Sequence, residues 1–166
     1  LVSERLTAIE TNPRLLKKVY TIYKDVNGDI WIGGIGGYLA ILRKNGQIDS
    51  YPINNIKAIT ADREGNIITV GRNGVYVIND AKKEFKLIEA LKPNEKTLAF
   101  STINAVYCTK DNRYVLATNG EGLVFYNPKN GEIRKLSINS GMPSDIIQGI
   151  VAENDTNMWA STTKGL

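Results

Sequence analysis

The sequence predicts an all-β fold, a β-propeller fragment of about three and a half four-stranded blades, which is about half of a seven-bladed ring. Three observations support this prediction. A unit of four short apolar or aromatic strands recurs along the chain, its turn glycines recur at matching places, and no helical periodicity interrupts it. A four-strand unit that returns about every 40 to 45 residues is typical of a propeller blade. A β-sandwich has no reason to repeat its turn glycines, and a β-solenoid has shorter repeats.

The first complete unit lies in residues 19–53. Its elements are a strand at 19–23, a turn at 25–28, a strand at 30–32, a glycine-rich turn at 35–37, a strand at 38–42, a hairpin turn at 44–46 and a strand at 47–53. Asn, Asp and Gly at the turns favour tight reversals, and the apolar and β-branched residues between them favour strands. The unit therefore predicts one antiparallel four-stranded sheet.

The second unit repeats the first without a gap. Gly28, Trp31, Gly34 and Gly37 return 37 residues later as Gly65, Ile68, Gly71 and Gly74. Val115 and then Trp159 hold the position of Trp31 in the next two copies, so the later periods are 47 and 44 residues. We therefore predict the outer strand of a preceding blade at 1–15, complete blades at 19–53, 56–92 and 103–138, and the first two strands of a further blade at 146–166.

Blades at both ends of such a fragment would each present a largely apolar face. We expect these faces to be covered by remaining blades of a longer parent chain or by self-association of two copies. We call the position held by Trp31, Ile68, Val115 and Trp159 the tryptophan slot. The two tryptophans could be platforms for sugar stacking, but the slot also accepts Ile and Val. Packing between neighbouring blades is therefore the expected role of both tryptophans.

Composition argues against several classes of function. The net charge is +4, from 21 basic and 17 acidic residues that are scattered in mixed clusters, so no basic stripe predicts nucleic-acid binding. The chain has no histidine, which is the commonest general base and zinc ligand, and its one cysteine, Cys108, is expected to be buried rather than reactive. No apolar stretch is long enough to span a membrane. We expect no catalytic residues, no metal and no cofactor.

Loops at one rim of the propeller are the candidate binding surface. The turns between second and third strands share this rim with the connections between blades at 12–14, 54–55, 93–101 and 140–145. The turns supply the candidate ligand-binding residues Arg72, Asn73, Asn119, Glu121 and Lys164. Their side chains can form hydrogen bonds with a hydroxylated ligand, although a solvated rim without a ligand fits the same residues.

The repeat resembles the regulator-propeller repeat of two-component regulators. Residues 25–39 carry the pattern most fully, as Asp-x-x-Gly-x-Ile-Trp-Ile-Gly followed by a glycine-rich turn and Tyr-Leu. Residues 141–150 resemble the linker between blades of that family, and residues 159–166 resemble its tryptophan segment. The match is weaker at 67–70 and 114–117, where the tryptophan is missing.

This resemblance implies the periplasmic sensor region of a Bacteroidetes-type hybrid two-component histidine kinase/response regulator. Such a parent chain would hold two seven-bladed propellers, a small β-sandwich, one membrane span and a cytoplasmic kinase. The implied function is the sensing of a glycan breakdown product, an oligosaccharide, with control of the kinase through dimer rearrangement. The family has no catalytic motif in its propellers, so this part is expected not to be an enzyme. A protein-interaction scaffold and a propeller lyase are the alternatives, and the lack of histidine disfavours the lyase.

Overall fold

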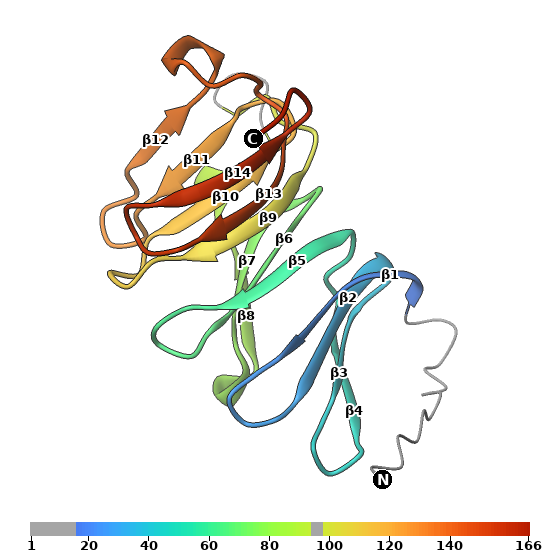
Figure 1. Cartoon of the computed structure of the whole chain (residues 1–166). Coiled ribbons are helices and arrows are strands. Elements are labelled where there is room, and N and C mark those ends of the chain that lie inside the picture. The colour runs from blue at the N-terminus through green and yellow to red at the C-terminus, as the bar shows by residue number, and fades with distance from the viewer. Residues whose placement is uncertain (1–15, 94–97) are drawn as a thin grey trace, which may run out of the picture.

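The computed structural model describes residues 16–93 and 98–166, which form an all-β fold (Figure 1). Three sheets have four strands each, and the last sheet has two. Within each sheet, every strand pairs antiparallel with its neighbour in chain order, as expected for strands joined by short turns. The helical segments in the described part are three short 3-10 turns, η1 (Asp80–Lys82), η2 (Glu89–Leu91) and η3 (Ile138–Ser140).

The sheets follow one another along the chain. The first contains β1 (Leu16–Lys24), β2 (Ile30–Gly36), β3 (Leu39–Leu42) and β4 (Ile48–Tyr51). The second contains β5 (Ile56–Ala61), β6 (Ile67–Gly71), β7 (Gly74–Asn79) and β8 (Glu84–Leu87). The third contains β9 (Ile103–Cys108), β10 (Tyr114–Thr118), β11 (Leu123–Tyr126) and β12 (Ile133–Leu136). The terminal sheet contains β13 (Ile147–Ala152) and β14 (Met158–Thr162). The outer strand expected at 1–15 lies outside the described residues.

Aspartate side chains fix the turn between the first two strands of a sheet. The carboxylate of Asp25 accepts hydrogen bonds from the backbone N–H groups of Asn27 and Asp29, at 2.9 and 3.0 Å, and from the indole N–H of Trp31 at 2.9 Å. Gly28 takes the positive φ of +88° that the reversal requires. In the second sheet Asp62 accepts from backbone N–H groups in the same way. The repeated Asp therefore acts as a side-chain support of a turn.

Neighbouring sheets pack face to face, and their first strands lie side by side in the order β1, β5, β9 and β13 (Figure 1). In its first three copies the tryptophan slot lies at the interface with the next sheet along the chain, where Trp31, Ile68 and Val115 are each 0% exposed. Trp31 also stacks on Tyr51, with ring centroids 6.2 Å apart and an 8° angle between the planes. Apolar contact between sheets thus supplies most of the core, as in other stacked repeats.

Trp159 does not follow this pattern, and the prediction that it packs between blades is wrong for the described chain. Its side chain is 59% exposed. Its neighbours Met158 and Ala160 pack towards the third sheet, so Trp159 points to the opposite face of β14 by strand alternation. No further sheet lies beyond that face in the described residues. Cys108 is buried, as expected.

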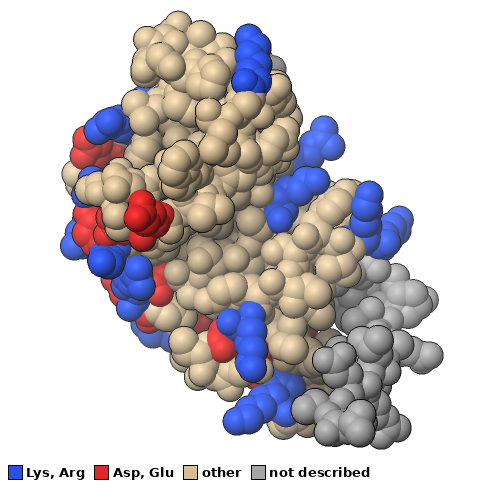
Figure 2. Space-filling view, viewed as in Figure 1, with Lys and Arg blue, Asp and Glu red and all other residues tan. Residues whose placement is uncertain are grey.

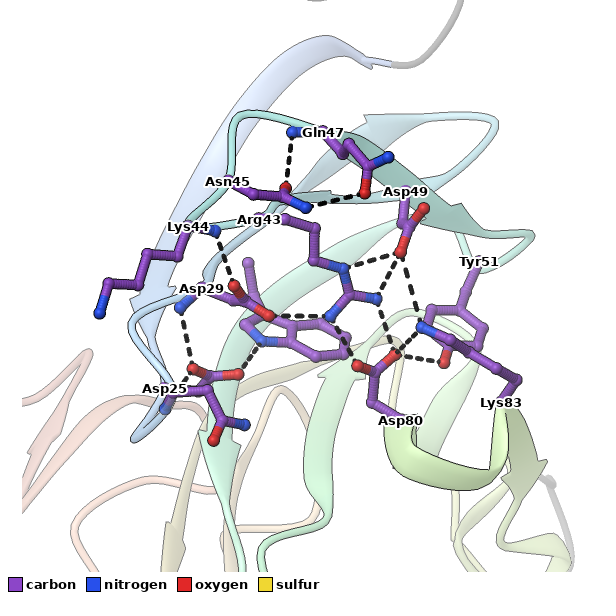
Figure 3. Close-up of polar contacts among 12 residues, drawn as sticks. Asp25, Asp29, Arg43, Lys44, Asn45, Gln47, Asp49, Tyr51, Asp80 and Lys83 are labelled. Atoms are coloured by element: carbon purple, nitrogen blue, oxygen red, sulfur yellow. Dashed lines mark hydrogen bonds and ion pairs between the residues drawn. The ribbon is translucent and has the colours of Figure 1, made fainter.

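An arginine ties the first sheet to the second (Figure 3). The guanidinium of Arg43, which follows β3, pairs with Asp29 of its own sheet at 2.9 Å. It also donates two hydrogen bonds to Asp80 of η1, at 2.6 and 2.9 Å, and one to Asp49 at 2.7 Å. The phenol of Tyr51 donates to Asp80 at 2.7 Å. We call Arg43 with these three carboxylates and Tyr51 the Arg43 cluster.

Electrostatics within the Arg43 cluster favour its charged form. The bonds from Arg43 lower the pKa of Asp80, and burial opposes that shift without reversing it. The same guanidinium lowers the pKa of Asp29. Burial, followed by the bond to Asp80, raises the pKa of Tyr51. The side chain of Arg43 is only 12% exposed, so the pairing operates where water screens charge weakly.

Gly71 lets the second strand of a sheet pass close to the chain entering that sheet. A Cβ at this position would lie 1.9 Å from the carbonyl oxygen of Asn55, a backbone atom that cannot rotate away. We expect Gly71→Ala to lower the free energy of unfolding by about 2 kcal/mol, the usual cost of forced overpacking. Urea unfolding followed by circular dichroism measures the loss. Gly149→Ala is the control, because its Cβ would meet only the Ser161 hydroxyl at 3.4 Å. Equal losses in the two variants would contradict the clash.

Candidate functional site

The turns lie at two opposite edges of the described chain (Figure 1). One edge holds the turns β1–β2, β5–β6 and β9–β10. The other, toward the upper right of Figure 1, holds the turns β2–β3 and β6–β7 with the connections between sheets, and we call it the rim. Figure 2 shows acidic and basic side chains interleaved along the left edge, whereas the charged side chains visible at the upper right are basic.

A hollow of about 290 Å³ opens at the rim where the first two sheets meet the chain that enters the third. Its lining comes from the first strands of these two sheets, β1 and β5, from two turns and from two connections between sheets. The lining residues are Tyr20, Ile35, Asn55, Lys57, Arg72, Ser101 and Thr102. We call this hollow the rim pocket. Among the described residues its lining contains two cationic side chains, several hydroxyl or amide groups and no carboxylate. Its volume is at the low end of the range of about 300 to 1,000 Å³ that is usual for small-molecule sites.

Tyr20 and Lys57 are the two lining residues that come from first strands of a sheet. They lie 37 residues apart, so they hold the same position in successive repeats, on β1 and β5. The ammonium of Lys57 lies 3.7 Å from the centroid of the Tyr20 ring, and that of Lys18 lies 5.3 Å from it. This cation–π attraction holds Lys57 in place without cancelling its charge.

Hydrogen bonds fix the backbone of the pocket but leave two of its side chains unsatisfied. The N–H of Arg72 donates to the carbonyl oxygen of Asn55 at 3.2 Å, and the N–H of Ser101 donates to the carbonyl oxygen of Asn119 at 3.1 Å. The buried hydroxyl oxygen of Thr102 has no hydrogen-bond partner among the described residues. Among the described residues, no carboxylate pairs with the guanidinium of Arg72. A buried polar atom without a partner costs free energy, so a new hydrogen bond to the Thr102 hydroxyl would remove that cost.

The structure places one of the five predicted site residues, Arg72, in the rim pocket. The side chain of Asn73 donates to the side-chain oxygen of Asn54 at 2.7 Å and does not line the pocket. Asn119 and Lys164 lie on other turns of the chain and do not line it either. The turns that carry the predicted residues therefore do not bring those side chains together at one point.

Glu121 has a structural partner. Its carboxylate forms an ion pair with Lys135 of β12 at 2.7 Å and accepts a hydrogen bond from the N–H of Ala99 at 2.8 Å. Burial opposes ionisation of Glu121, but the Lys135 ammonium and the Ala99 N–H outweigh it and lower its pKa. The carboxylate is therefore engaged in holding the loop before β9 against β11 and β12.

The sequence prediction missed three residues of the pocket, Tyr20, Lys57 and Thr102. The repeat carried a usable indication for the first two, because a Tyr and a Lys occupy equivalent positions, one 37-residue period apart, in the first strands of successive units. Thr102 had no such indication. Its place depends on how the connection from β8 to β9 folds over the rim.

A larger hollow, of about 610 Å³, lies between the third sheet and the terminal sheet. Apolar side chains such as Phe125, Leu136 and Met158 dominate its lining, and Trp159 borders it. In the second sheet the outer strands fill the corresponding space, as the contact of Phe85 with Tyr51 shows, with ring centroids 5.7 Å apart. The terminal sheet has two strands in the described chain, which accounts for this hollow without a ligand.

Comparison with known protein families identifies the first part of the repeat. Residues 15–36 match the family model described as "Two component regulator propeller". The chain carries a two-component regulator propeller repeat. The matched segment includes β1, the Asp25 turn and all of β2, so the resemblance to this family seen in the sequence is confirmed. No curated protein matches the sequence.

Solved structures with similar folds include parts of two bacterial proteins. The extracellular domain of the hybrid two-component system BT3049 of B. thetaiotaomicron aligns with a TM-score of 0.69 at 23% identity, over 92% of this chain and 20% of that one. PorZ of Porphyromonas gingivalis, a component of the type-IX secretion system, aligns with a TM-score of 0.72 at 16% identity, over 93% of this chain and 26% of that one.

An enzyme shares the fold as well. Streptogramin B lyase aligns with a TM-score of 0.66 at 16% identity, over 88% of this chain and 48% of that one. The chain thus spans between a fifth and a half of the length of these three structures. The likenesses confirm the predicted propeller fragment. In residues 16–93 and 98–166, no helix has the length and apolar character needed to cross a membrane.

Proposed function

We propose that these residues belong to the sensor propeller of a two-component regulator, located outside the cytoplasm, in the periplasm. The observation that carries this proposal is the family match over residues 15–36. The fold likeness to the extracellular domain of a hybrid two-component system supports it. The lyase alternative rests on fold likeness alone, and the chain lacks the histidine that most often serves as a general base.

The ligand in this proposal is an oligosaccharide that binds at the rim. The rim pocket offers hydroxyl and amide groups for sugar hydroxyls, and the apolar side chain of Ile35 offers contact for the C–H groups of a sugar ring. Arg72 belongs to the pocket, whereas Asn73, Asn119, Glu121 and Lys164 are proposed contacts for a longer ligand. Binding controls the parent's histidine kinase if the ligand has higher affinity for one arrangement of a dimer than for another.

Calorimetric titration of the complete protein with a panel of neutral and acidic oligosaccharides tests this proposal. We expect at least one oligosaccharide to bind and to bind more weakly to the Arg72→Gln variant. Lys110→Gln is the matched control, because Lys110 is an exposed cation of the β9–β10 turn at the opposite edge. Absence of binding across the panel, in a protein shown to be folded by circular dichroism, would contradict the sensor proposal.

A further inference from the structure

We infer that the rim pocket is specific for an acidic saccharide, one that bears a carboxylate on a sugar ring. This inference deepens the proposed function and rests on it. It starts from three features of the described residues: unneutralised positive charge, a buried hydroxyl without a partner, and a volume that accommodates a small ligand.

The charge of the pocket is positive and local. Lys57 and Arg72 line it, and Lys18 lies near the Tyr20 ring that forms its side. Elsewhere in the described chain, cations close to carboxylates are paired with them, as in the Arg43 cluster and in the pair of Lys135 with Glu121. In the rim pocket the partner of Lys57 is an aromatic ring, which positions the ammonium and leaves its charge available.

A carboxylate suits this arrangement of cations. The guanidinium of Arg72 can donate two parallel hydrogen bonds to a carboxylate, and the Lys57 ammonium supplies a second positive charge in the same lining. Charge-assisted hydrogen bonds of this kind are roughly twice as strong as neutral ones. Partial enclosure by protein strengthens them further than at an open surface.

The remaining lining favours a sugar over a simple anion. Asn55, Ser101 and Thr102 present amide and hydroxyl groups, and Tyr20 presents an aromatic ring and a phenol. Inorganic sulfate offers only acceptor oxygens, whereas the side-chain oxygens of Asn55 and Thr102 can also accept hydrogen bonds from a ligand hydroxyl. A uronic acid residue suits both the cationic and the neutral polar side chains of the lining. Its carboxylate can pair with the cations, and its ring hydroxyls can form hydrogen bonds with the amide and hydroxyl groups.

The experiment compares trigalacturonate with its methyl ester, which keeps the ring hydroxyls and loses the charge. Titration of the complete protein is expected to show at least tenfold weaker binding of the ester, the scale of one charged hydrogen bond. Lys57→Gln and Arg72→Gln should each weaken trigalacturonate binding about tenfold and leave the affinity for the ester unchanged. Thr102→Val should weaken binding of both compounds, and Lys110→Gln should affect neither. Affinity for trigalacturonate should also fall as salt is raised.

Other outcomes overturn the inference in distinguishable ways. Equal affinity for the acid and the ester, or binding of a neutral oligosaccharide alone, removes the preference for charge and leaves the sensor proposal standing. Inorganic sulfate that binds as tightly as trigalacturonate shows an anion site without sugar recognition. No binding of any saccharide removes both the inference and the sensor proposal. Circular dichroism of each glutamine variant separates a lost contact from a lost fold.

Discussion

Replacing Trp31 by alanine is expected to lower the free energy of unfolding by about 4 kcal/mol, within the range for buried aromatic residues. Trp31 is 0% exposed and lies in the interface between the first and second sheets. The substitution leaves a cavity there, removes the stacking on Tyr51 and leaves one Asp25 carboxylate oxygen without the indole N–H. Urea unfolding of the 166-residue chain, followed by circular dichroism, measures the effect.

Trp159→Ala provides the matched comparison, because the same side chain is removed from the same slot of the repeat. Trp159 is 59% exposed, so its removal forms no cavity and is expected to cost less than about 1 kcal/mol in the 166-residue chain. A difference of roughly 3 kcal/mol between the two variants therefore reports the presence of a packed neighbouring sheet. Similar losses for both would show that the terminal sheet is covered in solution, for example by a second copy.

The repeat made the fold predictable, because spacing and turn chemistry are local properties. Gly34 and Gly71 recur 37 residues apart, and each lies against the backbone of the chain that enters its sheet, at Lys18 and Asn55. A side chain would clash at both places, so the glycines record a constraint of the fold. The burial of Trp31 followed from the apolar character of its slot. The exposure of Trp159 could not be predicted from the slot, because burial depends on what lies across the interface and not on the residue alone.

The candidate site was less predictable, because it forms where segments from different repeats converge. Arg72 belongs to a turn that the repeat identifies, but its neighbours Ser101 and Thr102 come from a connection 29 residues or more away in sequence. Glu121 has the same exposed-turn character in the sequence as Arg72, yet Lys135 engages it. Sequence alone does not distinguish a cation or anion with a partner from one without.

Residues at equivalent positions of successive repeats touch each other, and this regularity could have been used to predict contacts between sheets from the sequence. Tyr20 contacts Lys57, and Arg43 contacts Asp80, and each pair is separated by the 37-residue period. Successive sheets are stacked with a small rotation, so equivalent residues come to lie opposite each other across the interface. Complementary residue types one period apart therefore predict contacts between sheets.

The Arg43 cluster is the strongest polar example of such a contact (Figure 3), and Arg43→Met is expected to lower the free energy of unfolding by about 3 kcal/mol. Methionine retains much of the apolar stem but leaves Asp29 and Asp80 without their cation in a largely buried place. Lys83→Met is the control. Lys83 pairs with Asp80 and Asp49 of the same cluster, but its side chain is 61% exposed, so the loss should stay below about 1 kcal/mol.

The pH dependence of the Arg43→Met effect distinguishes lost pairing from lost packing. Bonds from Arg43 hold the pKa values of Asp80 and Asp29 below their ordinary value in the folded chain. Their stabilising contribution is therefore complete above about pH 4, the unfolded value, and declines as the pH falls below it. Without Arg43 that contribution is absent, so the gap between wild type and variant should stay constant down to about pH 5 and narrow as the pH falls from about 4 to about 2 in urea unfolding. A gap that stays constant over this range would assign the loss to packing of the arginine stem instead.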